Sequence, residues 1–171
     1  MDTSPVYIKM CESAQEIQEF KKGIFNLLAS NIKLCGNFFY NKLWDAVFIA
    51  YCGIQKDNLR FASFDNLHID IQINNPQDIL IWLPRQDQLQ EILYIGIMDN
   101  FSLDLIKLFY IHLQANKLKL KSFEQIWLTF VMQVKYNKSW DGENWDEYTK
   151  TGANDILTDS EKSAFIKSLK K

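Results

Sequence analysis

The spacing of apolar residues changes once along the chain, and this change most constrains the fold. Before residue 84, runs such as His68–Ile73 (HIDIQI) alternate apolar and polar side chains. Such alternation is typical of a half-buried antiparallel strand. From Pro84 onward, apolar residues recur at helical spacing instead, which is typical of amphipathic helices. The sequence therefore predicts a small sheet followed by a helical half.

The N-terminal part of the chain divides into a helical segment and a set of strands. A helical period spans residues 5–29, with a break expected near Gly23. Residues 30–43 mix turn formers with aromatic residues, so they stay unassigned. The predicted class is α+β: an N-terminal helix, a small antiparallel sheet of about four strands, and a helical C-terminal half. The strands are predicted at residues 44–51, 58–64, 68–73 and 78–83, with short links that favour a meander.

Three helices are predicted after Pro84, and the third has clear signals at its ends. Ser122 and Gln125 have capping-box spacing at its start, and Asp141-Gly142 signals a turn beyond its end. We expect one domain over residues 1–148 and a C-terminal helical extension over residues 149–171. The residues predicted to face inward are Leu89, Ile92 and Leu93 in the first helix, Leu105, Ile106, Phe109 and Leu113 in the second, and Phe123, Ile126, Trp127, Phe130, Val131 and Val134 in the third.

Composition and charge exclude several classes of protein. The 171 residues are 47% apolar and 23% charged, which favours a globular chain over a disordered one. The net charge of −2 disfavours direct nucleic-acid binding through phosphates. No signal peptide is visible, and the longest apolar run, residues 47–54, is far shorter than the roughly 20 residues of a membrane helix. We therefore expect a cytoplasmic protein with no membrane association, whose oligomeric state the sequence leaves open.

Sequence motifs that would indicate a catalytic, metal-binding or phosphate-binding site are weak or absent. His68 and Asp70, together with His112, could mimic an iron-binding facial triad. However, His112 lies in a helical period, and too few strands are predicted for the barrel that usually carries such triads. Phosphate-binding loops and the HExxH zinc motif are absent, and the three cysteines contain no CxxC pair. We expect no catalytic residues, no metal and no cofactor.

One segment after the third predicted helix concentrates acidic and aromatic residues. It carries four carboxylates and no base between residues 139 and 148. Its spacing does not fit a calcium loop. It is therefore either a solvated acidic loop or a contact surface for a basic partner. The residues predicted to bind a partner are Trp140, Asp141, Glu143, Trp145, Asp146 and Glu147.

Two stretches of the sequence resemble a known group of proteins. They are residues 81–93, which contain PRQDQLQ, and residues 122–145, which contain EQIWLTFVMQVKYNKSWDGENW. Both are similar to segments of a small uncharacterised family of phages and prophages of low-GC Gram-positive bacteria. Members of that family often open with a segment similar to residues 7–18. The resemblance implies a phage accessory gene, and it brings no catalytic residues with it.

Four hypotheses for function follow from these observations. The first is a non-enzymatic phage protein that binds and inhibits a host protein in the cytoplasm, most of all a component of an anti-phage defence system, in an anti-CRISPR-like manner. The second is a protein that sequesters a nucleotide or another small ligand. The third is an enzyme centred on His68 and Asp70. The fourth is a virion or assembly component.

Overall fold

The computed structural model describes residues 1–26, 36–52, 59–63, 80–94, 103–116 and 119–148. The chain divides into two compact units, residues 1–85 and residues 86–171. Helices and strands are both present, so the predicted α+β class is confirmed. The single domain over residues 1–148 stays a prediction. The strand predicted at residues 68–73 and the extension over residues 149–171 lie outside the described residues.

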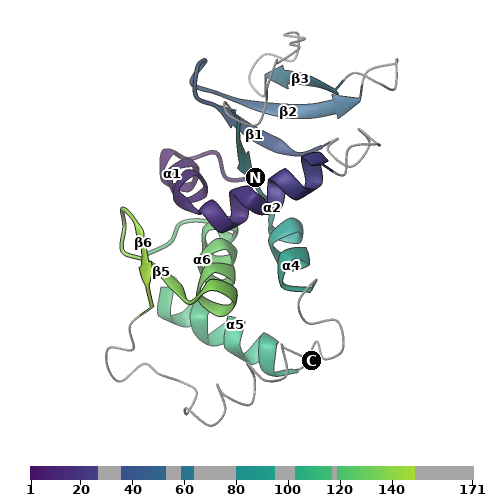
Figure 1. Ribbon diagram of the computed structural model, residues 1–171. Helices are drawn as coiled ribbons and strands as arrows, with labels where there is room; N and C mark the ends of the chain where they lie inside the picture. The colour runs from purple at the N-terminus through teal and green to yellow at the C-terminus, as the bar shows by residue number, and fades with distance from the viewer. Residues whose placement is uncertain (27–35, 53–58, 64–79, 95–102, 117–118, 149–171) are drawn as a thin grey trace. The chain divides into compact units, whose positions relative to one another are not determined.

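The first unit is built on an antiparallel sheet with the order β3-β2-β1-β4. Figure 1 shows β3, β2 and β1 side by side. The strands predicted at residues 44–51, 58–64 and 78–83 are confirmed. The meander holds from β1 to β3, whereas β4 pairs with β1. The four strands are β1 (Phe38–Asn41), β2 (Ala46–Cys52), β3 (Leu59–Ser63) and β4 (Leu80–Leu83).

Strand β1 lies in the stretch that the sequence left unassigned. Two of its turn formers, Asn37 and Asn41, lie at the two ends of the strand. Both are buried. The Oδ1 atom of Asn41 accepts a hydrogen bond from the Leu43 amide at 2.9 Å and so starts the turn into β2. Asp45, with φ of 49°, ends that turn in the left-handed region. Phe39 is fully buried between these ends. The mixture of turn formers and aromatic residues in the sequence is therefore explained by one short strand with a turn at its end.

Helices α1 (Pro5–Ser13) and α2 (Gln15–Asn26) precede the sheet. The Ser4 hydroxyl accepts from the Tyr7 amide at the start of α1, with Pro5 in the first turn. The helical segment breaks at Ala14, where ψ is 76°. The break predicted near Gly23 was therefore wrong, since that residue lies within α2. Ala14 is fully buried at the corner, and both helices contact β4.

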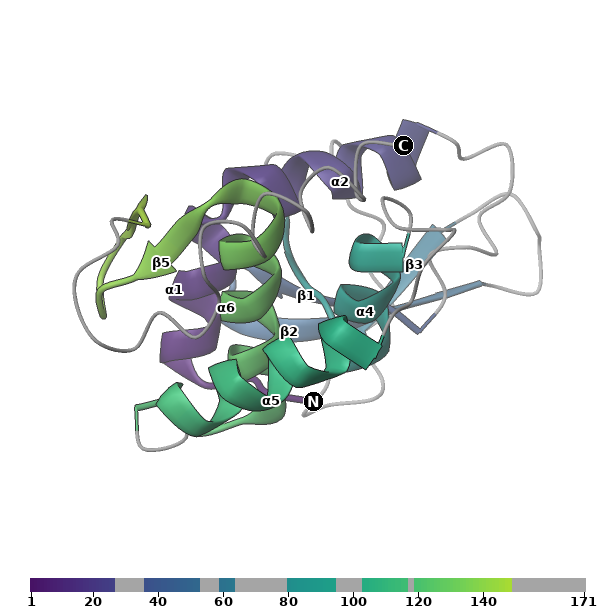
Figure 2. The same ribbon diagram turned by 90° about the horizontal axis from the view of Figure 1, so that it is seen from below.

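The second unit contains α4 (Gln86–Tyr94), α5 (Leu103–Asn116) and α6 (Phe123–Tyr136). Helix α6 contacts both α4 and α5, and Figure 2 shows α5 beside α6. The predicted cap is confirmed, because the Ser122 hydroxyl accepts from the Gln125 amide at 3.1 Å. The predicted inward residues of α4 are also confirmed: Leu89, Ile92 and Leu93 are buried.

Two residues predicted to face inward lie outside the core of this unit. Ile106 is 55% exposed and Phe123 is 56% exposed. Helix α5 meets α6 through a narrower stripe, in which Phe109 stacks on Trp127 with ring centroids 3.9 Å apart. Phe123 is the first residue of α6, so it precedes the part of the helix that is enclosed. Among the described helices, none has the length and apolar character needed to span a membrane.

Candidate functional site

The acidic and aromatic segment forms a β-hairpin directly after α6. Asn137 ends that helix in the left-handed conformation, and its amide donates to the Met132 carbonyl. The chain then enters β5 (Lys138–Trp140) and returns as β6 (Trp145–Glu147). The Tyr148 amide donates to the Asn137 carbonyl at 2.8 Å and closes the base of the hairpin. The candidate site is therefore an ordered element of the second unit.

Asp141 organises the turn of the hairpin. Its Oδ1 atom accepts hydrogen bonds from the backbone amides of Glu143 at 2.6 Å and Asn144 at 2.7 Å. Its own amide donates to the Asn144 carbonyl. Gly142 has φ of 115°, which a residue with a side chain rarely adopts. One carboxylate of the acidic cluster thus has a structural role, because it replaces the missing backbone partners of a tight turn.

The two tryptophans form a pair across the hairpin. Trp140 lies opposite Trp145 in the strand register. Their ring centroids are 5.1 Å apart at an interplanar angle of 56°. Both side chains are partly exposed. Aromatic pairs of this kind stabilise two-stranded sheets, so the pair helps to hold the two short strands together.

The six predicted residues do not share one face. Side chains alternate between the faces of a strand, so Trp140, Trp145 and Glu147 belong to one face and Asp146 to the other. Asp141 and Glu143 occupy the turn. Lys138 lies opposite Glu147 in the register and brings a positive charge to the tryptophan face. The hairpin therefore concentrates negative charge at its tip and on the Asp146 face.

Three carboxylates are presented outward on this scaffold. Glu143, Asp146 and Glu147 are all exposed. Sequence reasoning identified these residues and the turn at Asp141-Gly142, but it did not predict the strands β5 and β6 or the position of Lys138. The Asp-Gly turn followed by a second tryptophan was the available signal, since it fixes which residues lie opposite each other in a hairpin.

The second unit also contains a histidine-centred polar network. His112 Nδ1 lies 2.8 Å from Gln133 Oε1, and its Nε2 atom lies 2.9 Å from Thr129 Oγ1. The side-chain amide of Asn116 donates to the backbone carbonyl of His112 at 2.9 Å. Burial lowers the pKa of the imidazole to about 4. At neutral pH the ring is uncharged, so one nitrogen donates and the other accepts.

The partners of His112 matter for the iron-binding triad of His68, Asp70 and His112 that the sequence suggested. Both ring nitrogens of His112 have protein partners from α6, whereas His68 and Asp70 lie outside the described residues. Within the described ranges, no group of three or more histidine, cysteine, aspartate or glutamate side chains could hold a metal ion. His112 is best understood as a residue that joins α5 to α6.

Cys11, the first of the three cysteines, is a core residue. Cys11 is fully buried in α1, and burial raises the pKa of its thiol far above the usual range. Because the thiolate is the nucleophilic form, Cys11 is not prepared for covalent chemistry. The side chains of Cys35 and Cys52 lie outside what the structure describes.

Comparison with known proteins gives no relative on which to base a function. No protein-family model, no curated protein and no solved structure matches the chain.

Proposed function

We propose that this chain is a non-catalytic phage accessory protein that binds and inhibits a host protein of an anti-phage defence system, in an anti-CRISPR-like manner. One observation carries the proposal: an ordered hairpin presents exposed carboxylates around a partly exposed tryptophan pair. The phage origin rests on the resemblance of residues 81–93 and 122–145 to phage and prophage proteins. The cytoplasm of the host is the compartment in which such an inhibitor acts.

Three physical properties of the hairpin favour protein binding. Its turn is already held by Asp141, so little conformational entropy is lost on binding. Tryptophan is enriched among the residues that dominate interface energies. Exposed carboxylates attract a basic surface and speed its approach. Proteins that grip nucleic acid carry such basic surfaces, so an acidic hairpin can compete with their ligand.

The partner can be sought directly in the host. The tagged protein is incubated with extract of a low-GC Gram-positive bacterium, and bound proteins are identified by mass spectrometry. We expect one host protein at near-stoichiometric yield, with a basic contact surface. Binding should weaken as salt is raised, because screening reduces attraction between exposed charges.

Charge reversal tests the role of the hairpin in that complex. Asp141 is kept, because its loss would disturb the turn, while Glu143, Asp146 and Glu147 are replaced by lysine. We expect the affinity to fall by at least about tenfold. Glu143→Lys alone is compared with Glu91→Lys, an exposed glutamate of α4, which should leave the affinity unchanged.

Two results would contradict the proposal. If the triple variant binds the partner as tightly as the wild-type chain, the hairpin is not the contact surface. If no host protein is retained but a nucleotide raises the melting temperature, the protein sequesters a small ligand instead. The matched pair of single variants separates a local effect of Glu143 from a general effect of charge.

A further inference from the structure

The hairpin of β5 and β6 depends on α6 for its position. Beyond the pairing of its two strands, its main contacts among the described elements are those that β5 makes with α6. The chain enters the hairpin directly from that helix (Figure 1), because Asn137 is the C-cap of α6 and Lys138 is the first residue of β5. The direction in which the hairpin points is therefore set by the last turn of α6.

The last turn of α6 lies outside the enclosed part of the helix. Every residue from Gln125 to Met132 is buried, whereas none of residues 133–136 is buried. The ends of helices fray where tertiary contacts do not hold them. A hairpin that starts at such an end needs side-chain contacts that tie the turn to the rest of the unit.

Two side chains of this turn provide such contacts, and they reach two different helices. Gln133 Oε1 lies 2.8 Å from His112 Nδ1 of α5. The Nζ atom of Lys135 donates to the backbone carbonyl of Ile92 in α4 at 2.9 Å. Lys135 is the nearer of the two to the start of β5, so its contact has the more direct effect on the hairpin.

The bond from Lys135 is well matched to its acceptor. Ile92 is fully buried and lies in the last turn of α4, where backbone carbonyls have no partner inside the helix. The negative end of the helix dipole favours a cation there, and α4 has no basic residue of its own in that turn. Burial lowers the pKa of Lys135 from its usual value, as expected for an ammonium group partly withdrawn from water. Lys135 is therefore a cap for α4 that is supplied by α6.

We propose that Lys135 is a positioning residue for partner binding: by tying the last turn of α6 to the end of α4, it holds the hairpin in one orientation. This inference rests on the proposed function, in which the hairpin is the contact surface. A hairpin held in one orientation loses less conformational freedom when it binds. Lys135 acts through the hairpin and does not need to touch the partner.

The test compares Lys135→Met with the wild-type chain by residual dipolar couplings of the backbone amides in weakly aligned solution. Methionine keeps the apolar stem of the side chain and removes the donor. In the wild type, we expect the couplings of residues 138–147 to fit the same alignment as those of α4 and α6. In the variant, the couplings of the hairpin should shrink, because the hairpin moves relative to both helices. The circular-dichroism signal of the Trp140–Trp145 pair should persist, since Asp141 still holds the turn.

Two further variants control the comparison. Lys135→Arg keeps a donor that can reach a carbonyl, and it should restore the wild-type couplings. Lys119→Met removes the same charge from an exposed lysine that precedes α6, and it should leave the couplings unchanged. The affinity of Lys135→Met for the host protein recovered in the binding experiment should fall by about tenfold, and Lys135→Arg should restore it.

The inference is overturned if the hairpin of Lys135→Met keeps the wild-type couplings, or if Lys135→Arg does not restore them. It is also overturned if the couplings and the tryptophan signal are lost together, since Lys135 then stabilises the hairpin instead of positioning it. If Lys135→Met does not fold, Lys135→Gln takes its place with the same readouts. Changed couplings with an unchanged affinity would support the positioning role but contradict the hairpin as the contact surface, so the two failures are distinguishable.

Discussion

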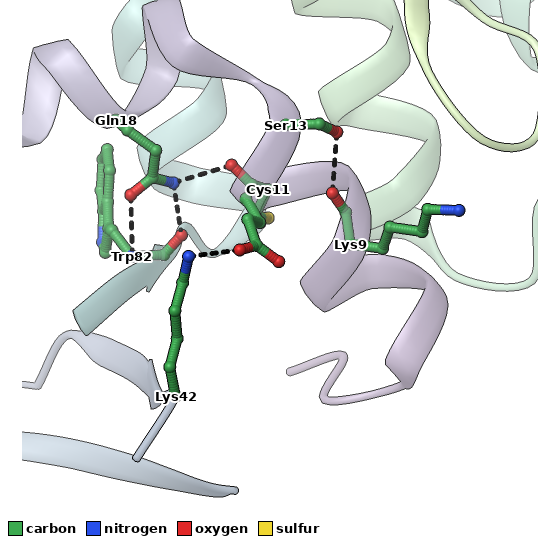
Figure 3. Close-up of polar contacts among 7 residues, drawn as sticks. Lys9, Cys11, Ser13, Gln18, Lys42 and Trp82 are labelled. Carbon is green, nitrogen blue, oxygen red and sulfur yellow. Dashed lines mark hydrogen bonds and ion pairs between the residues drawn. The ribbon is translucent and has the colours of Figure 1, made fainter. Parts of the chain in front are cut away.

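Each unit of the molecule contains a polar side chain that joins several elements, but the two side chains differ in kind. In the first unit, the side-chain amide of Gln18 in α2 donates to the Cys11 carbonyl of α1 and pairs with the backbone amide and carbonyl of Trp82 in β4 (Figure 3). His112 links α5 to α6 in the second. An amide donates and accepts at any pH, whereas an imidazole does both only while it is neutral. The comparison teaches that two buried hydrogen-bond networks in one protein can respond differently to acid.

The largest expected effect is a loss of stability of the second unit in acid. The pKa of His112 is about 4 in the folded chain and about 6.5 when unfolded. The unfolded state therefore takes up a proton first as pH falls. The stabilisation is present above pH 6.5 and lost between pH 6.5 and 4, by about 3 kcal/mol in total. Hydrogen exchange in α5 and α6, followed from pH 7 to 4, measures it.

The control for this prediction is His112→Gln, which removes the titrating group. The difference in pH dependence between the wild type and this variant isolates His112 from the carboxylates that titrate in the same range. If both proteins lose stability in parallel as pH falls, the network does not respond to acid as inferred, and the contrast between the two units disappears.

A smaller effect is expected in the first unit. Gln18→Leu keeps the volume of the side chain but leaves the Trp82 amide and carbonyl without their partner. We expect the free energy of unfolding to fall by about 1–3 kcal/mol. The difference from the wild type should be the same at pH 7 and pH 5, because no ionisable group is changed. Urea unfolding at the two pH values measures it, and a difference that grows in acid would contradict it.

The smallest effect is expected in the turn of the hairpin. Asp141→Ala removes the acceptor of two backbone amides in the turn. We expect a local loss of about 1 kcal/mol, detected as a weaker circular-dichroism signal of the Trp140–Trp145 pair. Asp141→Asn keeps a side-chain acceptor and should retain the signal. A fall in the stability of α5 as well would show that the hairpin and the His112 network are coupled.

Local signals in the sequence predicted the elements whose ends depend on neighbouring residues. The cap at Ser122 and the turn at Asp141-Gly142 follow from hydrogen bonds between residues close in the chain. The buried face of α4 follows from its helical period. The same reasoning located the strands at residues 44–51, 58–64 and 78–83, but it did not predict the strands β5 and β6 on either side of the Asp141-Gly142 turn.

Features that depend on distant residues were not predictable in this way. Gln18 has the appearance of an exposed polar residue in a helix until β4 is placed beside it. Ile106 fits the apolar period of α5, but this helix is enclosed mainly on its α6 side. Strand β1 was missed because its buried asparagines resemble loop residues. In each case the local sequence is compatible with two structures, and contacts with distant residues decide which one forms.

The pairing of β1 with β4 has a consequence for the kinetics of folding. It joins residues 38–41 to residues 80–83, so a long stretch of chain must close before the pair gains any stability. The hairpin at residues 138–147 closes over only a few residues. Contacts between distant residues slow folding. We therefore expect the first unit to reach its native sheet later than the hairpin forms.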